Sequence, residues 1–137
     1  MTNTERVKEM YAAFAQGEIA AIMDALADDV EWDFEAPAAI PFGGKRRGRA
    51  EAQGFFTGIG ATEENQVLTM TEFIESGNHV ATFGRYAATA KSTGIRYDTP
   101  AAHFWEFRDG KVVKYTNYSN TALAADAHTS AAAAAAR

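Results

Sequence analysis

Residues 97–120, YDTPAAHFWEFRDGKVVKYTNYSN, carry the pattern that decides the fold of this 137-residue chain. The order of apolar and polar side chains suits two long β-strands, over residues 97–107 and 112–120. Asp109-Gly110 lies between them and tolerates the positive φ of a tight hairpin turn. The stretch therefore predicts a pair of antiparallel strands near the end of the chain.

Two more strand-like runs precede this hairpin, at residues 66–76 and 79–89. Gly77-Asn78 joins them as a two-residue turn, and Ser92-Thr93-Gly94 marks the turn that follows. Long strands that are joined by short turns are typical of an antiparallel meander. We therefore expect the second half of the chain to form a sheet.

The first half of the chain predicts helices. Thr4 can cap the first helix, whose apolar residues recur at helical spacing over residues 7–14, and Gly17 ends it. A second short helix is expected over residues 19–26 and a third over residues 49–56. These helices precede most of the strands in the chain.

One strand is expected among the helices. Residues 30–35, VEWDFE, alternate apolar and acidic side chains, which indicates a strand with one buried face. Residues 36–48 contain prolines and glycines and predict a loop. The order helix, helix, strand, helix and meander implies an α+β domain, in which helices cover one face of a curved sheet and leave a cone with one open mouth.

The composition fits one globular domain. Hydrophobic residues make up 47% of the chain and charged residues 23%, which are ordinary values for a folded domain of this length. We place the domain at residues 1–123, followed by an alanine-rich tail over residues 124–137. Because the tail offers no face to bury, we expect it to fray.

Charge and residue content exclude several classes of function. The formal net charge of -5 argues against a nucleic-acid partner, because it repels phosphate groups. The absence of cysteine excludes disulfides, thiol nucleophiles and cysteine-ligated metals. The three histidines, His79, His103 and His128, are too scattered to predict a metal site. The first residues lack the features of a signal peptide and no apolar run could cross a membrane, so we expect a cytoplasmic protein without a membrane partner.

Four segments carry a resemblance to a known family. They are, in chain order, YAAFAQGE at residues 11–18, LADDVEW at 26–32, Gly48-Arg49 leading into Phe55-Phe56, and HFWEFRDGK at 103–111. With them the chain resembles, from about residue 5 to residue 121, the SnoaL-like branch of the nuclear transport factor 2-like superfamily, which includes ketosteroid isomerase. The resemblance implies a cone-shaped, cystatin-like α+β barrel, in which a curved antiparallel sheet packs on N-terminal helices. It also implies a pocket inside the cone and a homodimer formed through the outer face of the sheet.

The resemblance does not extend to the catalytic residues of ketosteroid isomerase. That enzyme uses a tyrosine, an aspartate base and an aspartate that its apolar site keeps protonated. The matching positions here hold Met10, Phe34 and Ala102, which can neither move a proton nor stabilise an oxyanion. Steroid isomerisation is therefore not expected. A shift of one residue in the match would bring Tyr11 and Asp33 into the site.

His103 is a candidate for proton transfer, because an imidazole exchanges protons near neutral pH. Strand alternation puts His103 on the face opposite to Ala102 and Phe104. If Ala102 lines the cone, as its match implies, His103 faces outward into the dimer interface. The sequence therefore leaves two roles open for His103, as a structural or interface residue and as a catalytic or ligand-contacting one.

Tyr11 and Asp33 are the other candidates for catalysis. Tyr11 either packs within its helix or donates a hydrogen bond into the pocket. Asp33 either belongs to the solvated face of its strand, together with Glu31 and Glu35, or acts as a general base. The sequence alone does not choose between these roles.

The same matching implies a pocket with aromatic walls. Its lining is expected to comprise Met10, Phe14, Trp32, Phe34, Phe55, Phe56 and Phe104. Such a pocket suits a flat or hydrophobic small molecule. Asn117 and Asn120 lie on the last strand, where relatives often carry Glu and Asp, and they either position the ligand or bond the strand-end backbone.

Two functions remain open. The first is a SnoaL-like enzyme that moves a proton on a hydrophobic, carbonyl-bearing substrate, as isomerases and cyclases of this family do. It requires an ionisable group inside the cone. The alternative is a non-catalytic module that binds a hydrophobic small molecule, which the loss of the isomerase residues favours. We expect no metal and no cofactor in either case.

Overall fold

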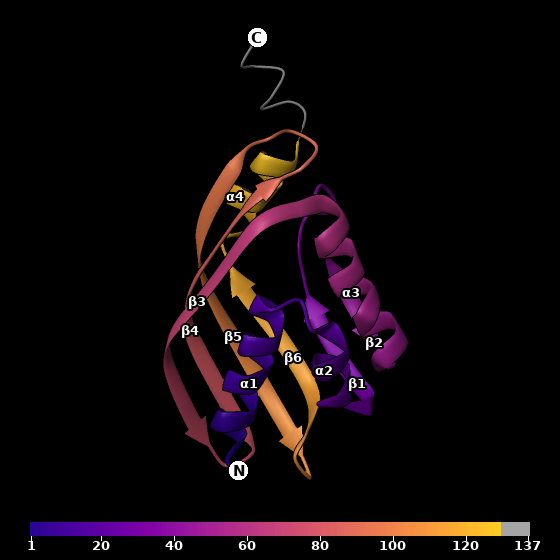
Figure 1. The fold of residues 1–137 in the computed structure, drawn as a ribbon, viewed down its shortest axis with the longest axis vertical. Helices are drawn as coiled ribbons and strands as arrows, with labels where there is room; N and C mark the ends of the chain where they lie inside the picture. The colour runs from indigo at the N-terminus through magenta and orange to yellow at the C-terminus, as the bar shows by residue number, and fades with distance from the viewer. Residues whose placement is uncertain (130–137) are drawn as a thin grey trace.

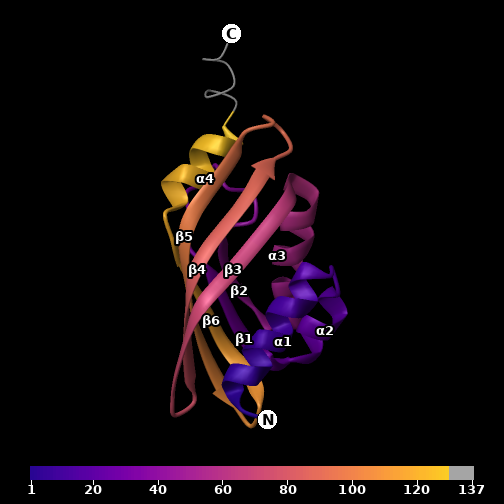
Figure 2. The ribbon, with the colours of Figure 1, turned by 60° about the vertical axis from the view of Figure 1, so that its left-hand side comes forward.

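The computed structural model describes residues 1–129, which form four helices and a curved six-stranded sheet (Figure 1). The strands are β1 (Leu26–Phe34), β2 (Gly44–Arg47), β3 (Glu63–Ser76), β4 (His79–Ala90), β5 (Arg96–Arg108) and β6 (Lys111–Ser119). The helices are α1 (Asn3–Ala15), α2 (Ile19–Asp24), α3 (Gly48–Thr62) and α4 (Thr121–His128). The expected α+β class is confirmed, with α1, α2 and α3 on one side of the sheet and α4 at one end of it (Figure 2). None of these helices is long and apolar enough to span a bilayer.

The strands follow the order β2-β1-β6-β5-β4-β3 across the sheet. The long strands from β3 to β6 form the predicted antiparallel meander. β1 lies beside β6 and runs parallel to it, with Trp32 opposite Tyr115. The sheet is therefore mixed rather than antiparallel throughout. α3 carries the chain from the edge at β2 to the opposite edge at β3.

β2 lies inside the stretch that was predicted to be a loop. It pairs antiparallel with β1, so that Arg47 lies opposite Glu31 and Gly44 opposite Phe34. None of its four residues, GKRR, is buried. A hydrophobic pattern cannot reveal a strand that buries no side chain.

α1 begins earlier than predicted, because its cap is Thr2 rather than Thr4. The Thr2 hydroxyl accepts the backbone N–H of Glu5 at 3.0 Å, and the Thr2 N–H donates to the Glu5 carboxylate at 2.8 Å. This reciprocal pair is a capping box. Thr4 instead donates its hydroxyl to Glu75 of β3 at 2.6 Å. Gly17 follows the end of the helix with a φ of 73°, as its predicted role requires.

The other two N-terminal helices differ in length from the prediction. α2 ends at Asp24, so that Leu26 already belongs to β1. α3 continues beyond the predicted residues 49–56 to Thr62 and adds the buried side chain of Ile59. The glycines in this part of α3 hid its continuation, since glycine is a poor helix former.

The sheet has a β-bulge between β3 and β4. Met70 pairs with Gly84 and the register then shifts at Glu72, so Thr71 is the extra residue of the bulge. A Cβ at Gly84 would overlap the carbonyl oxygen of Thr69, so the close approach of the two strands requires glycine. Bulges bend and twist a sheet, and the long strands curve around the helices (Figure 1).

α4 corrects the expectation that the chain frays from residue 124. Ala124 and Ala127 are buried, and His128 makes a buried hydrogen bond. A face of alanines is small enough to pack closely against the sheet, so this segment does have a face to bury. The rest of the expected tail, residues 130–137, lies outside the described residues.

Candidate functional site

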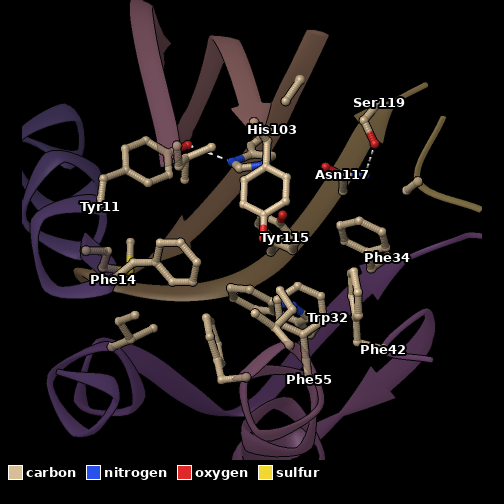
Figure 3. Close-up of a pocket in the computed structure, with 18 of the residues that line it drawn as sticks. Tyr11, Phe14, Trp32, Phe34, Phe42, Phe55, His103, Tyr115, Asn117 and Ser119 are labelled. Atoms are coloured by element: carbon tan, nitrogen blue, oxygen red, sulfur yellow. Dashed lines mark hydrogen bonds between the residues drawn. The ribbon is translucent and has the colours of Figure 1, made fainter. Parts of the chain in front are cut away.

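A cavity lies between the sheet and helices α1–α3. Its volume is about 70 Å³ and its wall is mostly aromatic (Figure 3). Six of the residues expected on the wall lie there, namely Met10, Phe14, Trp32, Phe34, Phe55 and Phe56. Strand alternation turns Trp32 and Phe34 inward together, and helical spacing does the same for Met10 and Phe14.

Phe104 lies outside the cavity, contrary to the expectation. Its side chain is 37% exposed on the outer face of β5, where its ring stacks on that of His79 with 5.0 Å between centroids. His103 and Trp105 line the cavity instead. The alternation along β5 was thus predicted correctly, but its phase was not. The match that placed Ala102 inside the cone is off by one residue here, and such a shift exchanges the two faces of a strand.

The remaining predicted residues divide between the two faces of the sheet. Tyr11, His103 and Asn117 line the cavity. Asp33 lies with Asn120 in an open groove on the outer face, so neither of them reaches the cavity wall. The structure therefore brings Tyr11 and His103 together and leaves Asp33 apart from them.

Tyr11 and His103 meet in a hydrogen-bonded network on the cavity wall (Figure 3). The Tyr11 hydroxyl lies 2.8 Å from Nδ1 of His103 and 2.6 Å from Oγ1 of Thr82. Trp105 donates its indole N–H to the same oxygen at 3.1 Å. One hydroxyl therefore links α1 to both β4 and β5.

Burial keeps this network neutral. Desolvation lowers the pKa of His103 to about 3, although the side chain of Asn117 opposes the shift. Desolvation also raises the pKa of Tyr11 above its usual value, against the hydrogen bonds to Thr82 and Trp105. At neutral pH His103 is therefore uncharged and Tyr11 keeps its proton.

One further donor on the wall has no protein partner among residues 1–129. Nε1 of Trp32 is buried and makes no hydrogen bond. The ring of Tyr115 stacks on Trp32, with 3.9 Å between centroids and 17° between planes, and burial holds its pKa well above the usual value. Its hydroxyl therefore stays protonated. Buried donors without partners are rare in native proteins, so the Trp32 N–H is a candidate donor to an oxygen atom of a ligand.

A second polar cluster was not foreseen from the sequence. It consists of Glu63, Tyr86, Tyr97 and His128, and is called the Glu63 cluster below. Tyr86 donates to Oε1 of Glu63 at 2.5 Å, whereas Tyr97 and His128 donate to Oε2, His128 at 2.7 Å. Tyr86 and Tyr97 also line the cavity. The four residues come from four different elements, so no local motif marks them.

The chemistry that these groups allow is hydrogen bonding and proton exchange. Within the described part of the chain, no three His, Asp or Glu side chains are grouped so as to hold a metal ion. The wall presents neutral donors, the imidazole of His103 and aromatic faces. Such a wall suits a flat molecule with a carbonyl oxygen.

Solved structures of other proteins have the same fold. An NTF2-like protein of unknown function from Burkholderia pseudomallei K96243 is 28% identical with a TM-score of 0.84, over 94% of this chain and 99% of that one. TerC, co-crystallised with polyporic acid, is 27% identical with a TM-score of 0.83, over 92% of this chain and 97% of TerC. A protein with a ketosteroid isomerase-like fold from Catenulispora acidiphila DSM 44928, in complex with trimethylamine, is 21% identical with a TM-score of 0.64, over 77% of this chain and 83% of that one.

The family follows from the sequence match. No curated protein matches the chain in sequence. The model of the SnoaL-like domain matches residues 7–115, which is most of the chain and includes both Tyr11 and His103. The chain therefore belongs to the SnoaL-like domain family.

Proposed function

We propose that this protein binds a flat, hydrophobic, carbonyl-bearing molecule in the aromatic cavity and moves a proton on it without a cofactor. The observation that carries the proposal is the contact between Tyr11 and His103 on the cavity wall, 2.8 Å from the hydroxyl oxygen to Nδ1. The related structure of TerC with polyporic acid supports a small organic ligand.

One arrangement of the protons leaves a base in the cavity. If Nδ1 of His103 carries the ring proton, it donates to the Tyr11 oxygen, as the indole of Trp105 also does. The Tyr11 hydroxyl then donates to Thr82. Nε2 of His103 carries no proton in this arrangement and is the proton acceptor.

The proposed reaction passes through an enolate. The carbonyl oxygen of the ligand accepts hydrogen bonds from Tyr115 and Trp32. His103 removes a proton from the carbon beside the carbonyl, and the C–H electron pair moves into the enolate, whose charge the two donors stabilise. Return of the proton from His103 to another carbon gives an isomer. Alternatively, attack of the enolate carbon on a second carbonyl of the same molecule closes a ring, and the proton on His103 passes to the alkoxide oxygen that forms. Both outcomes balance without an oxidant or a reductant.

Deuterium exchange tests the proton transfer. 2-Tetralone is a flat bicyclic ketone with acidic protons beside its carbonyl, and NMR in D₂O records each proton that is replaced. Wild-type protein is expected to accelerate this exchange over buffer, and His103→Gln to lower the accelerated rate about a hundredfold. His79→Gln is the matched control, because His79 lies on the outer face and is 44% exposed. Equal rates in His103→Gln and wild type would rule out His103 as the base.

The alternative is a non-catalytic binding module. A pKa of about 3 makes His103 a weak proton acceptor, which favours this alternative. Binding can be measured with 1,4-naphthoquinone, which quenches indole fluorescence, because Trp32 and Trp105 are the two tryptophans of the chain and both line the cavity. Saturable quenching by the quinone, together with no exchange of 2-tetralone in wild type, would establish the binding module.

We also propose a homodimer formed through the outer face of the sheet. Phe83, Phe104 and Tyr118 are 42%, 37% and 62% exposed. Strand pairing sets Phe83 beside Ala102 and Ala102 beside Tyr118, so an apolar row crosses β4, β5 and β6. Exposed aromatic side chains gathered on one face mark interaction surfaces.

A cytoplasmic location, expected from the sequence, likewise stays a prediction.

A further inference from the structure

α4 forms part of the cavity wall. Ala124 lines the cavity, and Ala124 and Ala127 are the buried residues of this helix. Figure 2 shows α4 at the end of the sheet remote from α1. Its one large apolar side chain, Leu123, is 39% exposed. Apolar contact of α4 is therefore limited to small alanine side chains and the ring of His128, which lies edge-on to the rings of Phe42 and Tyr97.

The Glu63 cluster provides the stronger attachment of α4. His128, the last residue of the helix, donates to Oε2 of Glu63 at 2.7 Å, and the two side chains are 2% and 0% exposed. Thr93, between β4 and β5, donates to the carbonyl oxygen of Ala127. Both contacts lie in the last turn of α4, whereas no side chain caps its first turn. The helix is therefore fastened at its carboxyl end.

Glu63 does not depend on His128 alone. Tyr86 and Tyr97 donate to its two carboxylate oxygens. Burial, together with the neighbouring Glu63 charge, raises the pKa of both tyrosines, so they remain donors. If His128 moves away, each oxygen of Glu63 keeps one tyrosine donor. Separation of Glu63 from His128 thus breaks one hydrogen bond and does not leave a bare buried charge.

The cavity is too small for the proposed ligands in this conformation. Its volume of about 70 Å³ compares with about 300 Å³ or more for typical ligand pockets, so part of the wall has to move when a ligand binds. Backbone hydrogen bonds hold the strands, and large buried side chains such as Met10 and Phe55 hold α1 and α3. α4, by contrast, is held by small side chains and by two hydrogen bonds in its last turn.

We propose that α4 is the lid of the cavity and that the hydrogen bond between His128 and Glu63 is its latch. The latch is closed in the free protein and open while the ligand occupies the cavity, a role that rests on the ligand binding proposed above. Movement of α4 takes the methyl group of Ala124 off the wall and enlarges the cavity at this end. α4 then controls how fast and how tightly ligands bind.

Rates of ligand exchange test the latch. Stopped-flow quenching of tryptophan fluorescence by 1,4-naphthoquinone gives the association and dissociation rates. Because the latch has to open before the ligand binds, His128→Ala is expected to raise the association rate about tenfold, to leave the dissociation rate within about twofold and so to lower the dissociation constant about tenfold. Asp126→Ala, on the exposed side of α4, is the matched control and is expected to change neither rate. An unchanged association rate in His128→Ala would overturn the latch.

Two measurements support this test independently. Glu63→Gln leaves one side-chain acceptor oxygen where Glu63 has two, for the same three donors, and is expected to accelerate association as His128→Ala does. Amide hydrogen exchange of the wild type needs no variant. The amides of α4 are expected to exchange faster than those of β5, and bound naphthoquinone is expected to accelerate them further. Equally slow hydrogen exchange in α4 and β5 would overturn the lid. Absence of saturable quenching in wild type would instead overturn the proposed ligand binding, and the hydrogen exchange of α4 would then be the test of the lid.

Discussion

At the scale of single residues, the surroundings of His103 determine its protonation. Its ring lies among those of Tyr11, Trp105 and Tyr115, with 5.7, 6.1 and 5.0 Å between centroids. Aromatic rings replace the water that would stabilise an imidazolium ion, so the folded protein holds the neutral form. The proton affinity of this one side chain is therefore linked to folding.

The linkage predicts that the folded state loses stability in mild acid. The pKa of His103 falls from 6.5 to about 3 on folding, so between these values the unfolded chain binds the extra proton. The contribution of neutral His103 to the free energy of unfolding is complete above pH 6.5 and decreases as the pH falls. Between pH 7 and pH 5 the folded state is expected to lose about 2 kcal/mol. Urea unfolding of wild type and His103→Gln at the two pH values measures it. A difference between pH 7 and pH 5 that is the same in both proteins would show that His103 is not the source.

At the scale of helices and strands, periodic patterns predicted the elements that bury a whole face. α1 and the strands from β4 to β6 follow such patterns over many residues, so they were found. β2 buries no side chain, and the apolar residues that α4 buries are alanines, so neither stands out by hydrophobicity. Element ends depend on single hydrogen bonds, such as the one that makes Thr2 the cap, and periodicity does not report those.

The same reasoning explains which part of the site was predicted. The wall residues on β1 alternate with acidic ones, so Trp32 and Phe34 could be assigned to the inner face. On β5 both faces carry aromatic groups, Trp105 inside and Phe104 outside, and no contrast in polarity fixes the phase. The Glu63 cluster joins residues that are remote in the chain, so only the folded chain reveals it.

The capping box of α1 predicts a difference between two neighbouring threonines. Thr2→Ala removes the side-chain acceptor for the Glu5 N–H, and is expected to lower the free energy of unfolding by about 1 kcal/mol. Thr4→Ala removes only an exposed hydrogen bond to Glu75, and is expected to stay within about 0.5 kcal/mol of wild type. Thermal and urea unfolding of the two variants compare them. A larger loss from Thr4→Ala would place the cap at Thr4 after all.

Replacement of glycine by alanine is expected to have opposite effects at Gly84, which lies at the bulge between β3 and β4, and at Gly60 in α3. Gly84→Ala drives a methyl group into the backbone at Thr69, and is expected to lower the free energy of unfolding by about 2 kcal/mol or more. A Cβ at Gly60 of α3 meets nothing within 4 Å, so Gly60→Ala is expected to stabilise the protein by about 0.5–1 kcal/mol. Urea unfolding measures both. Tolerance of Gly84→Ala without loss would mean that the two strands do not approach so closely.

At the scale of the whole molecule, the sheet separates two different surfaces. Its inner face and helices α1–α3 enclose the cavity, and its outer face exposes aromatic side chains (Figures 1 and 2). Ligand binding and pairing of two copies would therefore use opposite sides of the same strands. His103 and Phe104 are adjacent in sequence and serve one surface each.

This division predicts that dimerisation can be removed without loss of the cavity. The wild type is expected to sediment at twice the monomer mass of 14.8 kDa, and Phe104→Glu at the monomer mass, because the dimer would bury two carboxylates. Leu123→Glu, an exposed apolar position on α4, is the matched control and is expected to remain dimeric. Naphthoquinone quenching is expected to persist in Phe104→Glu. A monomeric wild type would contradict the dimer.

The parallel pairing of β1 with β6 constrains how the protein folds during synthesis. Residues 26–34 leave the ribosome early, but their neighbour in the sheet, residues 111–119, is made near the end of the chain. Until then one edge of β1 has no partner strand, and Trp32 lacks the ring of Tyr115 that covers it in the native state. Contacts between such distant segments fold slowly, and an unpaired strand edge invites aggregation. The nascent chain is therefore the form of this protein that most needs chaperones, and a chain cut short before β6 would keep that need permanently.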